Sequence, residues 1–423
     1  MRVCLFEDRG VLDLEPLTLT RPVFELLCGL TSLGDQQRRL FTSSETGLLV
    51  RPELADLCRQ RYPGTPVNDA AWLRAGPTVL INGRWLPDPQ TVPDTTHPCV
   101  ALVGDDIAYI VLDPHHLTRC SVETLEEHLA CWKAKLPQQH TGGQLFRYLW
   151  EIVAHNGEQI GRDWELQHYA PSPGKGSPAI VGPAELLHLD PTARVDPQVV
   201  VDTTGGPVVI GPGAFISAFT RLEGPCCIGP QTQVHGARIR AGTTLGPACR
   251  IGGEVEASIV QGYSNKYHEG FLGHAYVGEW VNLGAGTSNS DLRNDYGEVR
   301  VMVNGRLVAT GQTKVGCFLG DHTKTGLGTL LNTGTNAGIF GNLLPGGLLP
   351  RYLPSFVSYW NHSLADRADL WALLQTAATV MSRRGHELTE AHSRLYGELY
   401  ERTAGERRRV VREAELRTWR RSA

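Results

Sequence analysis

The chain has 423 residues, of which 41% are hydrophobic and 20% charged, and its formal net charge is −4. This length predicts at least two domains. The charge excludes a general attraction to nucleic acid or to a membrane surface, and no run of about 18 apolar residues predicts a membrane span. The start does not resemble a signal peptide. Ten scattered cysteines without a CxxC pair favour a reducing cytoplasm over disulfides or a zinc knuckle.

Residues 1–168 alternate between strand-like and helix-like segments. Apolar runs predict strands at 1–6, 46–50 and 77–83. Apolar residues at helical spacing predict helices at 21–41, with Pro22 in the first turn, and at 52–63, 122–136 and 143–160. This alternation is typical of an α/β domain with a parallel or mixed sheet. Its ligands are expected at the carboxyl ends of the strands, just after Phe6 and Ile81.

A linker and entry segment, 169–196, is predicted because 169–183 is rich in proline, glycine and serine. From 197 to 350, mostly aliphatic residues recur at steps of six, with a slip of one after Val234 and breaks after Ile251 and Leu283. The positions are Ile210, Ile216, Leu222, Ile228, Val234, Ile239, Leu245, Ile251, Val277, Leu283, Leu319, Thr325, Leu331 and Ala337. This period fits neither a helix nor an ordinary sheet and predicts a left-handed parallel β-helix, whose axis receives one such side chain per hexad.

Two segments fall outside the repeat. Residues 288–313 interrupt it and predict a strand hairpin that projects as an arm. Residues 351–423 predict a helical tail, which is rich in arginine near its end. Glutamate and arginine alternate there at i,i+3 and i,i+4 spacing, which favours a solvated helix with ion pairs over a basic contact surface.

Three motifs carry a resemblance to a known family: "EPLTLTRPVFEL" at 15–26, "GAGTSNSDL" at 284–292 and "GDHTKTG" at 320–326. The chain resembles the bifunctional GlmU-type enzymes, which acetylate glucosamine-1-phosphate and then transfer a nucleotide to it. It is particularly similar to a divergent branch of sugar nucleotidyltransferases with a PLT-x-TRP motif near the N-terminus. The resemblance implies a homotrimer with sites in clefts between subunits, and acetyl-CoA as co-substrate.

The resemblance assigns His268 as the general base, which takes a proton from the sugar amine. Histidine suits this role because it titrates near neutrality. Asn282 is expected to fix the sugar, and the glycine-rich corner at Gly284, Ala285 and Gly286 to admit the pantetheine arm of CoA. Further substrate contacts are expected from Arg240, Lys266 and Asp291.

The pattern also departs from the family. The usual asparagine–tyrosine pair after GAGT is Asp291–Leu292 here. Phe271 replaces an aromatic residue near the base, keeping the ring but losing its hydroxyl group. His274 stands where the family often has an aspartate. The alternative for His274 and His322 is a structural role, in which both are polar side chains that pack within a solenoid. A metal alternative is a γ-carbonic-anhydrase-like zinc site, for which His235, His268 and His274 would supply ligands.

The N-terminal domain lacks the glycine-rich loop of sugar nucleotidyltransferases, which cradles the triphosphate. Aligned on the PLT motif, residues 8–13 occupy that place, and Arg9 and Arg21 remain as expected phosphate contacts. Asp105 and Asp106 could hold Mg²⁺, although Gly-Asp-Asp also suits a hairpin turn.

The sequence therefore predicts a cytoplasmic transferase with two activities. One is amino-sugar-phosphate acetylation, and the other is nucleotidyl transfer to a sugar-1-phosphate, giving a nucleotide sugar such as UDP-N-acetylglucosamine. The alternative is a hexapeptide scaffold that binds sugar nucleotides without catalysis. The expected partners are small substrates, with neither nucleic acid nor membrane.

Overall fold

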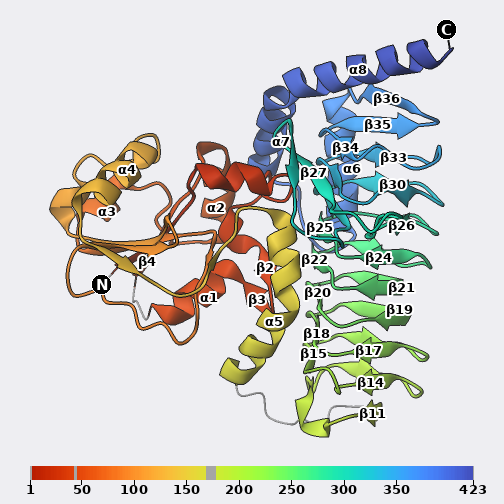
Figure 1. Ribbon diagram of the computed structural model, residues 1–423, viewed down its shortest axis with the longest axis horizontal. Helices are drawn as coiled ribbons and strands as arrows, with labels where there is room; N and C mark the ends of the chain where they lie inside the picture. The colour runs from red at the N-terminus through yellow and green to blue at the C-terminus, as the bar shows by residue number, and fades with distance from the viewer. Residues whose placement is uncertain (1, 42–44, 168–177, 423) are drawn as a thin grey trace. The chain divides into compact units, whose positions relative to one another are not determined.

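The computed structural model describes residues 2–41, 45–167 and 178–422, and the chain divides into two compact units (Figure 1). Unit 1 consists of Met1–Leu14, Thr20–Leu26 and Thr31–Tyr148, and unit 2 of Glu15–Leu19, Leu27–Leu30 and Leu149–Ala423. The central part of the expected linker, 168–177, lies outside the described residues. None of the described helices is both long and apolar enough to cross a membrane.

Unit 1 is built on a mixed six-stranded sheet. Its order is β4 (Glu45–Leu49), β1 (Arg2–Phe6), β5 (Thr78–Asn82), β8 (Asp106–Leu112), β7 (Cys99–Val103) and β9 (Gln138–His140). β1 pairs in parallel with β4 and β5, whereas β8 runs antiparallel to β5 and β7. The start of β8 therefore lies at the same sheet edge as the carboxyl end of β5.

The helices of unit 1 are α1 (Leu33–Leu40), α2 (Ala55–Arg61), α3 (Ala70–Arg74) and α4 (Leu125–Lys135). The prediction of one helix over 21–41 is wrong, because only its last third is α-helical and Val23–Glu25 forms a 3₁₀ turn. Gly29 adopts a left-handed conformation (φ +78°), which a continuous helix does not allow. The new helix starts where the Ser32 side chain accepts the amide N–H of Asp35.

Unit 2 contains a parallel β-helix, so the predicted combination of an α/β domain and a β-helix is confirmed. Face 1 consists of β12 (Leu187–Leu189), β15 (Val208–Ile210), β18 (Cys226–Ile228), β20 (Thr243–Leu245), β22 (Ile259–Gly262), β25 (Tyr276–Glu279), β29 (Cys317–Leu319), β32 (Thr335–Ala337) and β34 (Tyr352–Leu353). Strands β11 (Ala179–Val181) and β36 (Ser363–Asp366) show that the stack begins before residue 197 and continues past 350.

Two further faces share the strands β19 (Gln233–Ile239) and β21 (Arg250–Glu256), each of which passes a corner. Face 2 holds the first halves of these strands with β13 (Arg194–Val195), β16 (Phe215–Ile216), β23 (Asn265–Lys266), β30 (Lys324–Thr325), β33 (Asn342–Leu343) and β35 (Val357–Trp360). Face 3 holds the second halves with β11, β14 (Val200–Asp202), β17 (Arg221–Glu223), β24 (Phe271–Gly273), β26 (Ser288–Asn289) and β31 (Leu330–Leu331).

The hexad side chains fill the axis of the β-helix as predicted, and every one of them is buried. The slip after Val234 is a corner. The strand register shifts between His235 and Arg238, and Gly236 adopts φ +54°. One position breaks the apolar rule, because Lys266 pairs in register with Ile251 and occupies the same inward row. The lysine is only 3% exposed.

The insertion at 288–313 does contain the predicted hairpin, formed by β27 (Arg300–Val303) and β28 (Arg306–Ala309) around Asn304-Gly305. It does not project as a free arm. Val301 and Val303 are buried, and the Asn336 side chain donates a hydrogen bond of 2.9 Å to the carbonyl of Met302. One apolar side of the hairpin therefore lies against the β-helix.

Helix α5 (Leu149–Gln167) belongs to unit 2 and runs along face 1 (Figure 1). The chain ends in α6 (Leu370–Ser382), α7 (Glu390–Arg402) and α8 (Ala404–Ser422). Arg409 and Glu413 of α8 form the expected exposed ion pair at 2.9 Å. The helix also packs Val410, Val411 and Ala414 against the core of the β-helix. It therefore covers the last coil as well as meeting solvent.

The third corner of the β-helix carries a column of stacked rings: Tyr263, Trp280, His322, Phe340 and Phe356. His322 is 1% exposed, and its Nε2 lies 3.1 Å from the hydroxyl of Tyr396 in α7. These contacts give His322 a structural role in joining the C-terminal helices to the coils.

The cysteines provide a test of this fold. All ten are free, and only Cys131 is exposed. Burial raises the pKa of Cys227, Cys249 and Cys317 to about 12, so their reactive thiolates are scarce at neutral pH. We expect a thiol reagent such as DTNB to modify a single cysteine rapidly at pH 8, and all ten in guanidinium. Rapid native modification in a Cys131→Ser variant would contradict the burial of the other nine thiols.

Candidate functional site

The carboxyl edge of the unit 1 sheet is closed by an ion pair. Asp8, which follows β1, accepts hydrogen bonds from Nε and Nη2 of Arg84 at 2.7 and 2.6 Å. Arg84 is 5% exposed and also donates to the carbonyl of Phe146. Asn82 donates to Asp8 Oδ2 at 2.8 Å. The segment expected to hold the phosphate loop is therefore tied to the end of β5 by a bidentate pair.

A second buried pair fixes the neighbouring strand end. Glu7, 7% exposed, accepts from the amide of Val23 at 3.0 Å and from Nε of Arg51 at 3.1 Å. Of the two expected phosphate contacts, Arg9 is exposed, and its amide donates to Glu126. Arg21 is 0% exposed, and its carbonyl accepts from Arg51. A buried Arg21 side chain cannot meet a ligand from solvent, whereas Arg9 can.

The two aspartates expected to hold Mg²⁺ lie at the β7–β8 turn, at the same sheet edge. Asn82 connects them to Asp8, since its amide also donates to the carbonyl of Ile107 at 3.0 Å. Asp106 Oδ2 is paired with Arg147 at 2.6 Å, and the carbonyl of Asp105 accepts from Lys133. The Gly-Asp-Asp segment therefore forms a hairpin turn, as the sequence also allowed. Because Asp8 and Asp106 are both paired with arginines, a metal ion would have to compete with these arginines for the two carboxylates.

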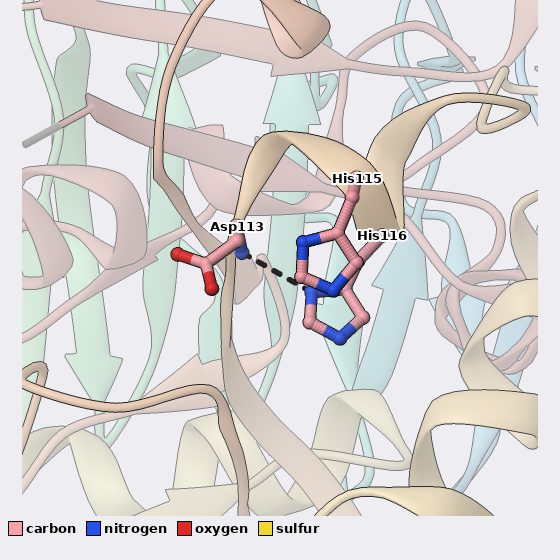
Figure 2. A group of neighbouring side chains, drawn as sticks. All are labelled: Asp113, His115 and His116. Atoms are coloured by element: carbon pink, nitrogen blue, oxygen red, sulfur yellow. Dashed lines mark hydrogen bonds between the residues drawn. The ribbon is translucent and has the colours of Figure 1, made fainter.

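One trio of metal-type ligands occurs among the described residues: Asp113, His115 and His116, whose donor atoms lie within 4.8 Å of one another. Figure 2 shows the Asp113 carboxylate on one side of the turn and both rings on the other. The Asp113 amide donates to His116 Nδ1 at 3.3 Å, and the Asp113 side chain caps the following 3₁₀ turn. Asp113 and His116 form a capping box, and His115 contacts the ring of His116. The zinc set of His235, His268 and His274 does not gather within the described chain.

In unit 2, several of the expected acetyltransferase residues line one groove of about 430 Å³ at the corner between faces 2 and 3. Its lining is Arg250, Asn265, Tyr267, His268, Asn282, Leu283, Gly284, Ala285 and Leu327. His268 and Asn282 are both exposed. The Asn265 amide donates to Asn282 Oδ1 at 3.3 Å. The structure thus brings the expected base, amide and glycine corner together.

The glycine corner has a steric basis. A Cβ atom at Gly284 would lie 2.6 Å from the carbonyl oxygen of Gly326 in the next coil, so a larger residue would push the coils apart. Gly286 adopts φ +75° and donates its amide to the carbonyl of Glu269 at 2.9 Å. This bond stacks the 284–287 corner on the 267–270 corner that carries His268.

Lys266 does not lie in the groove. Its Nζ points into the β-helix and donates to the carbonyls of Gly252 at 2.8 Å, Gly270 at 2.6 Å and His268 at 3.3 Å. Burial lowers the pKa of this amine to about 8. The expected contact with a substrate phosphate is therefore incompatible with the structure, since all three donors of the ammonium are used inside the protein.

Arg240 lies on face 3 within a balanced set of charges. Its Nε is 2.8 Å from Glu254, which also pairs with Arg238 at 3.3 Å. Lys314 lies 3.6 Å from Glu256. Each of these cations therefore has a carboxylate neighbour, and a phosphate would have to compete with Glu254 for Arg240.

Two departures from the family pattern contact each other on this face. His274 Nδ1 lies 2.8 Å from Asp291 Oδ2, at the base of the insertion. Burial acts to raise the pKa of Asp291, but the hydrogen bond and charge of His274, with the charge of Lys314, hold that pKa below its usual value. A Cβ at Gly273 would touch both Phe271 and Asp291, so this aromatic ring borders the pair.

Asp291→Ala tests this pair. A depressed carboxyl pKa stabilises the fold above the ordinary value, and the contribution is lost as the pH falls through the folded pKa. We expect the variant to lower the free energy of unfolding at pH 6 by about 1 kcal/mol, because the pair is partly solvated. In urea unfolding the difference should shrink at pH 3. An equal difference at both pH values would show that the ion pair contributes nothing.

The sequence reasoning missed Asp8 and Arg84 in unit 1, and Arg250, Asn265 and Tyr267 in the groove. The coil register offered a signal for the latter group, because Arg250, Asn265 and Asn282 follow one another up the same column. For Asp8 and Arg84 the signal was weaker. Both residues follow strand ends, but nothing in the sequence shows that they pair.

A mixed α/β sheet followed by a parallel β-helix with a histidine at a glycine-rich corner defines a two-domain class, in which a nucleotidyltransferase-like domain is joined to an acyltransferase-like solenoid. Residues 3–169 match the family model described as "Sugar nucleotidyl transferase". This match covers the α/β part of the chain, and the relatives that follow include bifunctional nucleotidylyltransferase/acetyltransferase and GlmU proteins, to which the chain is similar.

Several curated proteins are similar to part of this chain. A "Bifunctional sugar-1-phosphate nucleotidylyltransferase/acetyltransferase" of Sulfurisphaera tokodaii is 34% identical over 39% of this chain and 40% of its own length. An "Uncharacterized acetyltransferase YaiX" of Escherichia coli O6:K15:H31 is 27% identical over 48% of this chain and 89% of its own length. A "Bifunctional protein GlmU" of Azorhizobium caulinodans is 36% identical over 26% of each. The chain thus spans well under half of both bifunctional relatives.

Proposed function

We propose that the chain is a bifunctional transferase. The β-helix acetylates an amino sugar phosphate with acetyl-CoA, and the α/β domain transfers a nucleotide to a sugar-1-phosphate, giving a nucleotide sugar such as UDP-N-acetylglucosamine. The observation that carries this proposal is the groove in which His268, Asn282 and Gly284 meet. The printed functions of the bifunctional relatives support it.

In the acetylation step, His268 takes a proton from the sugar amine as the nitrogen attacks the thioester carbonyl. The new C–N bond forms and the C–S bond breaks, which releases CoA thiolate to accept a proton. An exposed imidazole at the groove suits this role, because its ordinary pKa lies near neutrality. Asn282 would orient the sugar, and the backbone of the corner at Gly284, Ala285 and Gly286 would admit the pantetheine arm of acetyl-CoA.

The groove is open on one side, and Leu327 at its rim is 71% exposed. A second copy of the chain would cover this apolar side chain and enclose the acetyl group. We therefore propose a homotrimer with sites between subunits. Arg240 is proposed to leave its ion pair with Glu254 and bind the sugar phosphate instead. Asp291, which pairs with His274, is proposed to contact the acceptor sugar.

In the α/β domain, the nucleoside triphosphate is proposed to bind as its Mg²⁺ complex at the edge that carries Arg9, Asp105 and Asp106. Mg²⁺ commonly uses one or two carboxylates together with substrate phosphates. The role of this chain's residues would be to neutralise and align the phosphates, which is most of what phosphoryl transfer asks of a protein. Arg21 would act through the fold, since its side chain is buried.

A paired assay tests the two halves separately. We expect thiol release from acetyl-CoA with glucosamine-1-phosphate, and pyrophosphate release from UTP or dTTP with sugar-1-phosphates. Glucosamine without phosphate serves as the acceptor control and should react more slowly if Arg240 binds phosphate. Absence of thiol release with every amino sugar tested would refute the acetyltransferase proposal, and absence of pyrophosphate release would refute the other.

A second candidate function for unit 1 is non-catalytic binding of a sugar nucleotide. The Asp8–Arg84 ion pair favours this binding role, because the pair holds a fixed turn where a catalytic enzyme would have its phosphate-binding loop. Binding of UDP-sugar in calorimetry without pyrophosphate release would support this role over nucleotidyl transfer.

A further inference from the structure

The inward row of the β-helix contains one charged group directly beneath the His268 corner. Lys266 follows Ile251 in register and precedes Leu283 along the chain, yet it ends in an ammonium group rather than a methyl group. A buried ammonium is costly unless its donors are satisfied. Here three backbone carbonyls satisfy them, and two belong to the loop 267–270, those of His268 and Gly270.

The third carbonyl, that of Gly252, belongs to the preceding coil. The lysine therefore joins the loop that carries His268 to the coil beneath it from inside the solenoid. The coil from Ile251 to Lys266 spans fifteen residues, whereas the coil from Val234 to Ile251 spans seventeen, so Lys266 ends a shortened coil.

No side-chain hydrogen bond to the imidazole of His268 occurs among the described residues. Among the rings of the described residues, it contacts that of Tyr267 alone, at 5.1 Å between centroids. The position of the imidazole thus depends mainly on the conformation of its own backbone, and that backbone is held through the His268 carbonyl.

We propose that Lys266 is a positioning residue for His268, whose ammonium group holds the loop 267–270 in the conformation that presents the imidazole to the groove. The proposal rests on the acetyltransferase function for its kinetic test, but not for its structural test. It assigns Lys266 a role inside the protein in place of a contact with substrate.

The link is sensitive to pH. Burial lowers the pKa of Lys266 to about 8, against the opposing influence of Glu269 and Glu254, with Arg238 lowering it further. The neighbouring His268 lies on the same loop. Above this pH the amine has only two N–H donors for three carbonyls, so the loop loosens. Acetylation is therefore expected to decline on the alkaline side as Lys266 loses its proton.

The kinetic experiment compares Lys266→Met with the full-length wild-type chain. Methionine keeps the buried length but removes all three donors. We expect kcat for acetylation of glucosamine-1-phosphate to fall about 100-fold, as for a small misplacement of a catalytic group, with little change in either KM. The alkaline decline near the Lys266 pKa should disappear from the pH profile. An unchanged kcat and pH profile would overturn the proposal.

Leu343→Ala is the matched control, because Leu343 lies in the same inward row, away from the corner. It should lower the melting temperature without a comparable loss of kcat. If both variants lose kcat in proportion to their loss of thermal stability, Lys266 is merely structural and the proposal fails.

Amide hydrogen exchange decides the proposal without reference to activity. In Lys266→Met, the amides of the 267–271 segment should exchange at least about tenfold faster, as expected for local opening, while those of Cys226–Ile228 stay protected. Unchanged exchange in the 267–271 segment would refute the proposal. If the wild-type chain transfers no acetyl group, the proposed function fails, and the exchange result alone still accepts or rejects the role of Lys266.

Discussion

His268→Ala is expected to reduce acetyl transfer by about 10²- to 10⁴-fold, the usual contribution of a general base. His268 is exposed at the groove and makes few contacts, so its loss should leave the fold intact. The rate should fall in kcat and in kcat/KM alike, because the interaction exists only in the transition state. Thiol release from acetyl-CoA, measured with glucosamine-1-phosphate from pH 6 to 9, provides the readout.

The matched control is His274→Ala on face 3, whose imidazole pairs with Asp291 rather than lining the groove. This variant should keep most of the activity and mainly raise KM for the acceptor. A reversed result, with His274→Ala inactive and His268→Ala active, would transfer the role of base to His274. The melting temperature of both variants should be measured to exclude unfolding.

Asp8→Ala is expected to destabilise the α/β unit by about 3 kcal/mol, because it leaves the buried guanidinium of Arg84 without its carboxylate. The guanidinium of Arg84 would then retain its hydrogen bond to the carbonyl of Phe146 but lose both bonds to Asp8. Urea unfolding should show an earlier transition for unit 1, while the β-helix transition stays unchanged. Pyrophosphate release should be lost in the same variant, because Asn82 also loses its hydrogen bond to Asp8.

A double variant separates the lost pair from the buried charge. Asp8→Ala combined with Arg84→Met removes both members and should recover part of the stability, since an apolar replacement of a buried pair is often tolerated. If the double variant is as unstable as the sum of the single variants, the two residues are not coupled and the pair does not close this sheet edge.

The repeat was predictable because each hexad residue has one environment. A six-residue period places Ile210, Leu245 and Leu319 on the same axis whatever the loops do. The sequence could not show that Lys266 continues this row. A lysine between polar residues resembles a surface contact, and its direction depends on the carbonyls around it. Lys266 ends strand β23 and points inward, whereas His268 follows in the corner loop and is exposed.

The site in the α/β unit was less predictable. The strand ends after Phe6 and Ile81 were located correctly from apolar runs, so the sheet edge was known. Which charges meet there depends on pairing between distant segments, as between Asp8 and Arg84. The long helix expected over 21–41 failed because apolar spacing outweighed Gly29, whose positive φ marks a break.

The two ends of the solenoid differ in a way that affects assembly. At the last coil, α8 covers the stack with Val410 and Val411. At the first coil, β11 pairs only with β14 among the described residues, and its side chains Ile180 and Val181 are 41% and 45% exposed. An open strand edge can template another strand. Association through this edge would therefore stop at a pair of chains joined by their β11 ends, because α8 covers the other end of each solenoid.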